Sequence, residues 1–130
     1  MPNNEERKQI NIKKETTLGD VSIADEVVAV IAALAASDVE GVDSMAGMIR
    51  SDFAGKVGSR SLGKGVKVEV IDSVVTVQLS INLKYNYSII QVSQKVQEKV
   101  KATIENMTGL TVADVNIKIA GVEMESGLNP

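Results

Sequence analysis

Residues 66–85, VKVEVIDSVVTVQLSINLKY, carry the pattern that decides the fold. Apolar and polar side chains alternate over 66–70 and again over 75–85, which predicts two β-strands that each bury one face. A turn near Asp72–Ser73 separates them, so they are expected to form an antiparallel hairpin. The outward row of the longer strand is polar and almost uncharged: Thr76, Gln78, Ser80, Asn82 and Lys84.

A long amphipathic helix is expected after the hairpin. Ser88 is a suitable N-cap, and Gln91 stands three residues later, as in a capping box. Gly109 supplies the left-handed residue that commonly follows a helix C-terminus. Alternation over 115–119 then predicts a final strand. The helix should bury one stripe of apolar residues: Ile89, Val92, Val96, Val100, Ile104 and Met107.

The N-terminal half predicts a strand, a helix and a second short strand. LGDVSI (18–23) and VEGVDSMAG (39–47) are the strand candidates, and residues 24–37 have helical periodicity. The helix start remains open between a capping box of Ser22 with Asp25 and Asp25 as the cap itself. Its buried face is expected to carry Val27, Ile31 and Leu34.

This order of elements predicts an α+β fold. Each helix and the long strand have one apolar face, which favours a two-layer α/β sandwich. It would consist of a mixed sheet of about four to five strands with two helices packed on one face. We expect a disordered leader over 1–17, a single domain over 18–122 and a C-terminal tail over 123–130.

The composition excludes several classes of enzyme and metal site. The chain has 130 residues, one domain's length, with no cysteine and no histidine. Disulfides, thiolate zinc sites and Ser–His–Asp triads are therefore impossible. We predict no catalytic, metal-binding or cofactor-binding residue. The longest apolar run, VVAVIAALAA (27–36), is about half a membrane span, so a cytoplasmic protein is expected.

Residues 48–65, which we call the basic connector, separate the two halves of the chain. Four of its eighteen residues are glycine. Four bases and no acid lie between Phe53 and Val68, whereas the net charge of the whole chain is −3. This cluster could bind an acidic protein surface, lipid headgroups or phosphate, or simply be solvated. The candidate partner-binding residues are Lys56, Arg60, Gly63, Lys64, Gly65 and Lys67.

Two short motifs in the connector suggest an alternative function. GSRSLGKG (58–65) lacks only the final Ser or Thr of a P-loop, but a strand pattern follows it where a P-loop requires a helix. Gly55–Gly58 is a GxxG, as in KH domains, yet the chain has one Phe and two Tyr for base stacking. A phosphate-, nucleotide- or RNA-binding module is thus the alternative, although the net negative charge makes nucleic acid an unfavoured partner.

Several ordered segments resemble the alkaline-shock protein family of bacterial envelope stress response proteins. GDVSIADEVVAVIAALAASDVEGV, GKGVKVEV and the stretch from LKYNYS to GVEME carry the resemblance, which covers roughly residues 18–125. The second half is similar to the subgroup often encoded beside acetyl-CoA carboxylase subunits in Gram-positive bacteria. The connector over 48–62 matches little. The markers are Glu40-Gly41-Val42, Gly63-Lys64-Gly65-Val66, Thr108-Gly109-Leu110 and Val115-Asn116-Ile117.

The resemblance implies a small cytoplasmic, non-enzymatic general stress protein that acts through protein contacts. Its implied roles are the envelope stress response or control of fatty-acid synthesis. The implied partners are a membrane-anchor protein, which would recruit the chain to the membrane periphery, or an acetyl-CoA carboxylase component. It also implies that Gly63-Lys64-Gly65 is a turn. Separately, the polar row of the long strand leads us to expect self-association into an oligomer.

Overall fold

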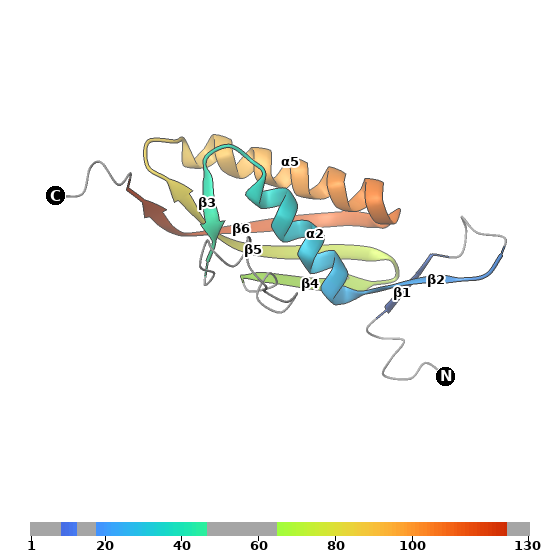
Figure 1. Cartoon of the computed structure of the whole chain (residues 1–130). Helices are drawn as coiled ribbons and strands as arrows, with labels where there is room; N and C mark the ends of the chain where they lie inside the picture. Colours follow the sequence, from blue (N-terminus) through green and yellow to red (C-terminus); the bar gives the residue numbers. More distant parts are fainter. Residues whose placement is uncertain (1–8, 13–17, 47–64, 125–130) are drawn as a thin grey trace.

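The computed structural model describes residues 9–12, 18–46 and 65–124 (Figure 1). Alternation and helical periodicity account for the elements that form. In chain order they are β1 (Gln9–Ile12), β2 (Val21–Ala24), α2 (Asp25–Ser37), β3 (Val42–Met45), β4 (Val66–Ile71), β5 (Val74–Lys84), α5 (Ile89–Thr108) and β6 (Thr111–Glu123).

Strand β5 is the centre of a mixed four-stranded sheet. On one side it pairs in parallel with β6 along its whole length. On the other side it pairs antiparallel with β4 through residues 74–79 and with β3 through residues 81–83. Strands β3 and β4 therefore follow one another along the same edge of β5.

The predicted hairpin is confirmed, and its turn has a clear backbone signature. Asp72 and Ser73 have φ values of 52° and 66°. Positive φ at both central residues is typical of the type I′ turn, whose twist suits a two-residue hairpin. The turn sets the pairing of Ile71 with Val74, so Val75, Val77 and Leu79 lie on the buried face.

Helix α5 follows the predicted pattern closely. The Gln91 N–H donates to the Ser88 side-chain oxygen (3.2 Å), and Gly109 takes the left-handed conformation at the helix end. The central stripe of Val92, Val96, Val100 and Ile104 is buried. Ile89 and Met107, expected in the same stripe, are exposed because they stand at the two ends of the helix.

Helix α2 buries a different set of residues from the one expected. Ile31 is buried, but Val27 and Leu34 are each 48% exposed. Small residues form most of the contact surface instead: Ala32, Ala33, Ala35 and Ala36 are buried. The helix begins at Asp25 with Ala24 as its N-cap and no side-chain cap hydrogen bond, so neither predicted cap forms.

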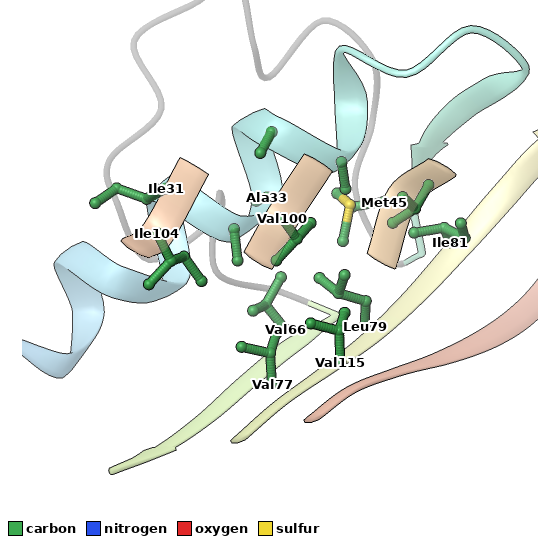
Figure 2. Close-up of a cluster of buried hydrophobic side chains, with 14 of the residues drawn as sticks. Ile31, Ala33, Met45, Val66, Val77, Leu79, Ile81, Val100, Ile104 and Val115 are labelled. Carbon is green, nitrogen blue, oxygen red and sulfur yellow. The ribbon is translucent and has the colours of Figure 1, made fainter. Parts of the chain in front are cut away.

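Both helices pack side by side on one face of the sheet, which confirms the two-layer sandwich (Figure 1). The core lies between the layers, where Ile31, Val100 and Ile104 come from the helices and Leu79 and Val77 from β5 (Figure 2). Helix α5 is also tied to the edge strand. The Gln97 side-chain amide donates to the Val115 carbonyl oxygen (3.1 Å), and the Val112 N–H donates to Glu105 Oε2 (2.9 Å).

The segment expected to be a disordered leader contains a strand. Gln9–Ile12 forms β1 and pairs antiparallel with β2. The expectation missed it because four residues with two β-branched isoleucines are too short to stand out from polar neighbours. Residues 1–8 and 13–17 lie outside the described part of the chain, as do 125–130 of the expected tail, and β6 itself runs to Glu123.

Candidate functional site: the open face of the sheet

The predicted partner-binding residues divide between the described and undescribed parts of the chain. Lys56, Arg60, Gly63 and Lys64 lie outside the described residues. Gly65 immediately precedes β4, and Lys67 is exposed on it. Only these last two can be placed in the fold.

The two residues that flank segment 47–64, Ala46 and Gly65, are both hydrogen-bonded to the same residue of β5. The Ala46 N–H donates to the Ser80 carbonyl oxygen (2.8 Å). The Ser80 N–H donates to the Gly65 carbonyl oxygen (2.8 Å). We call this junction of Ala46, Ser80 and Gly65 the neck, because it closes the sheet where β3 ends and β4 begins.

Gly65 is required by the backbone of the neck. Its φ is +78°, and a Cβ there would lie 2.8 Å from the Ala46 carbonyl oxygen and 3.1 Å from that of Ser80. A side chain would thus meet strand backbone that cannot move without losing hydrogen bonds. The glycine has a structural reason that needs no bound phosphate.

The strand that follows the connector argues against the P-loop hypothesis, and the GxxG hypothesis is not tested. Gly65 leads directly into strand β4, whereas the lysine of a P-loop stands at the start of a helix. The GxxG at Gly55–Gly58 lies outside the described residues, so the RNA-binding alternative stays a prediction.

Lys67 belongs to a polar surface on the side of the sheet away from the helices, which we call the open face. Lys67 and Glu69 of β4 line a shallow depression of about 300 Å³ with Thr76 and Gln78 of β5. The open face carries the polar residues Lys67 and Glu69 on β4, Thr76, Gln78, Ser80, Asn82 and Lys84 on β5, and Asp114, Asn116, Lys118 and Glu123 on β6, and Ile71 and Val74 are exposed on it at the hairpin end.

One end of the open face is ordered by contacts that cross three strands. The Asn82 side-chain amide donates to the Ser44 hydroxyl on β3 (3.2 Å). On the other side Asn82 pairs with Gly121 of β6, where a Cβ would lie 3.0 Å from the Asn82 Oδ1 atom. Asn82 is therefore held in a polar contact with one neighbour and close against the other.

Sequence reasoning identified the row on β5 but not the residues of β6 that flank it. Asp114, Asn116 and Lys118 take their places because β6 has a one-residue irregularity at Ala113, and a second one follows them at Ala120. Each shifts the register between the strands. The isolated Asp114 just before an alternating Val115–Ile119 run was the available signal, but no pattern fixes a parallel register.

A second polar group lies on the helix side, where α2 leads into β3. Asp38 and Lys99 form an ion pair (3.4 Å), and the Tyr87 hydroxyl donates to Glu40 Oε2 (3.4 Å). These residues line or adjoin a shallow depression of about 470 Å³ whose floor includes Val39. Its charges are mixed and exposed, and its contacts tie α5 to the α2–β3 turn.

Asp25 is the one side chain in the described residues with a buried oxygen, Oδ1, that lacks a hydrogen-bond partner. Burial raises the pKa of the Asp25 carboxyl above its usual value of 3.8. The folded state then binds the proton more tightly than the unfolded state does. The resulting penalty is absent below about pH 3.8, grows as the pH rises from there towards the raised pKa, and is complete above it.

Asp25→Asn should therefore raise the melting temperature at pH 7, and the gain should fade as the pH falls towards 4. Thermal unfolding followed by circular dichroism at the two pH values measures both quantities. Glu26→Gln is the matched control, because Glu26 is an exposed carboxylate in the same helical turn. A lower melting temperature for Asp25→Asn at pH 7 would contradict the direction of the shift.

Two kinds of site are not found where the structure is described. Within residues 9–12, 18–46 and 65–124, no three His, Cys, Asp or Glu residues are grouped so as to hold a metal ion. No helix in those ranges is long and apolar enough to cross a membrane.

Comparison with known proteins places the chain in a family. A model of the alkaline shock protein family, described as having a "cell envelope-related function", matches residues 13–124. Curated relatives include "Uncharacterized protein YqhY" of Bacillus subtilis (strain 168), 38% identical over 87% of this chain and 84% of that protein. "Uncharacterized protein YloU" of the same organism is 31% identical over 88% of this chain and 98% of that protein.

The solved structures that resemble the chain are more distant. "MamM CTD H264A-E289A-C267S" has a TM-score of 0.48 and 14% identity, and the match covers 75% of this chain and 95% of that one. "MamM CTD E289H - Nickel form" has the same TM-score with 13% identity, covering 75% and 99%. The family match over most of the sequence is decisive: the chain belongs to the alkaline shock protein family, whose function is related to the cell envelope.

Proposed function

We propose that this chain is a non-catalytic interaction protein that serves the cell envelope by contacting another protein through its open face. One observation carries the proposal: both described helices pack on the same side of the sheet, and the opposite side presents a largely polar surface, with Ile71 and Val74 exposed at its hairpin end. Family membership supports the setting in the cell envelope.

The chemistry of the open face suits a protein partner. Its central row, Thr76 to Asn82, consists of hydroxyl and amide groups, which both donate and accept hydrogen bonds. Charged groups are depleted at the centres of protein interfaces because they are costly to desolvate, and this row carries none. The charges stand to either side, on β4 and β6, where an interface rim would be.

Two settings are consistent with this function. In one the protein acts in the envelope stress response, recruited from the cytoplasm to the membrane periphery by an anchor protein. In the other it restrains fatty-acid synthesis by contacting an acetyl-CoA carboxylase component. The two settings differ in the partner and not in the surface that the chain offers.

A photo-crosslinking amino acid at position 78 tests the proposal in the native host. Gln78 is exposed at the middle of the open face, and Lys101, exposed on α5, is the matched control position. We expect a covalent adduct with a protein identified by mass spectrometry from position 78 and none from position 101. No adduct from position 78, or equal adducts from both, would overturn the proposal.

The basic connector can be examined in the same cells. Changing Lys56, Arg60 and Lys64 to glutamate reverses the charge at these three positions without altering a described residue. An adduct at position 78 that persists in this variant assigns the contact to the open face. Loss of the adduct, with an unchanged melting temperature, would show that the connector is needed for binding.

A further inference from the structure

Four of the charged residues on the open face form two groups of opposite sign across the strands, whereas Lys84 and Glu123 stand at its far end. Glu69 and Asp114 both align with Thr76 of β5, one from each side. Two residues further along β5, Lys67 aligns with Gln78. Lys118 aligns with Ser80, which lies two residues beyond Gln78. The acidic group thus lies beside the basic one, and each contributes one charge on β4 and one on β6.

These four charges are available for an intermolecular contact. Lys67, Glu69, Asp114 and Lys118 are all exposed. Within the described part of the chain the ion pair found is Lys99 with Asp38, on the helix side, and it involves none of the four. An intermolecular contact can therefore pair them.

With the strands of the two copies aligned, a second copy of the same face can satisfy these four charges in one of two symmetric arrangements. Two sheets that meet face to face are related by a two-fold axis in the plane of contact. If the axis runs along the strands, β4 covers β6 and Glu69 faces Asp114, so like charges meet. If it runs across the strands, β4 covers β4 and β6 covers β6, so Glu69 faces Lys67 and Asp114 faces Lys118.

We propose that the open face pairs with the open face of a second copy about the axis that crosses the strands. This inference rests on the proposed function, because it names a second copy of the chain as a protein that binds the same surface. The contact is isologous: every attraction occurs twice. The centres of the two charge pairs differ by one residue, about 3.3 Å along the strand, which long side chains accommodate.

The size of the overlap predicts a weak and salt-sensitive dimer. The facing rows span about 25 Å along the strands and about 14 Å across three strands, or roughly 350 Å². A stable interface buries about 800 Å² on each partner. Association should therefore depend on protein concentration and weaken as salt screens the exposed charges.

Charge reversal on β6 tests the arrangement with purified protein in sedimentation equilibrium at low salt. Lys118→Glu alone sets the introduced glutamate against Asp114 twice in the dimer, and Asp114→Lys alone sets two lysines together. Each should weaken self-association about tenfold. An equimolar mixture of the two variants should restore it, because both contacts are then between opposite charges.

The controls separate this inference from the proposed function. Glu98→Lys on α5 changes an exposed charge on the helix side and should leave association unchanged. A wild-type protein that stays monomeric at all concentrations, or a mixture that associates no better than either variant, would overturn the inference. An adduct between position 78 and a different protein in cells would then leave the proposed function standing.

Discussion

Replacing Leu79 with alanine is expected to lower the free energy of unfolding by about 2–5 kcal/mol. Leu79 is 1% exposed and lies in the middle of β5, between Val66 of β4 and Ile117 of β6. It points into the core beneath the helices (Figure 2). Because all its neighbours are held by strands or helices, the cavity cannot collapse. Urea denaturation with an unchanged m-value measures the loss.

Gln78→Ala is the control for this prediction. Gln78 precedes Leu79 on the same strand but points to the open face, so its truncation should change the free energy of unfolding by no more than about 0.5 kcal/mol. Comparable losses in the two variants would show that β5 does not have one buried and one open face.

Replacing Gly41 with alanine should cost about 2–4 kcal/mol for two separate reasons. The φ of Gly41 is +100°, which L-residues rarely adopt. A Cβ there would also lie 2.8 Å from Val92 Cγ2 and 2.9 Å from Tyr87 Cδ2. Both side chains belong to the junction that joins the start of α5 to the α2–β3 turn. Thermal and urea unfolding of the variant measure the cost.

Gly109→Ala separates the two contributions. Gly109 also has a positive φ, +78°, but a Cβ there would meet nothing within 4 Å. Its replacement should therefore show the backbone cost alone, about 1 kcal/mol. If Gly41→Ala were no worse than Gly109→Ala, the contact with Val92 and Tyr87 would have no energetic importance.

The second half of the fold was predictable because its signals are local and agree with one another. The alternation in β5 identifies the buried face, and the turn at Asp72–Ser73 fixes the hairpin. In α5, the Ser88 cap, the valine stripe and Gly109 mark the start, the face and the end independently. Each of these signals depends on residues near one another in the chain.

Helix α2 could not be oriented from its sequence because it is apolar nearly all round. Periodicity favours the large residues, and Val27 and Leu34 were therefore assigned to the core. In the structure the helix packs against the sheet and α5 with Val28, Ala32 and Ala36 fully buried, while Val27 and Leu34 are each 48% exposed. Only the packed neighbours decide which face is buried.

The candidate site was predicted in part. The polar row from Thr76 to Asn82 follows from the alternation of β5 alone. The charges that flank it do not, because Asp114 and Lys118 reach the open face through a parallel register that is shifted by one residue at Ala113. The connector attracted attention by its composition, but of its proposed residues only Gly65 and the adjoining Lys67 lie in the described chain.

The neck has a consequence for how this protein can change over time. Ala46 and Gly65 are both hydrogen-bonded to Ser80 of β5. The positions of β3 and β4 on this edge therefore do not depend on the length of the chain between them. Doubling the length of that segment costs only about 0.6 kcal/mol in closure entropy. A lineage could therefore lengthen, shorten or recharge this stretch while the sheet on either side of it stays the same.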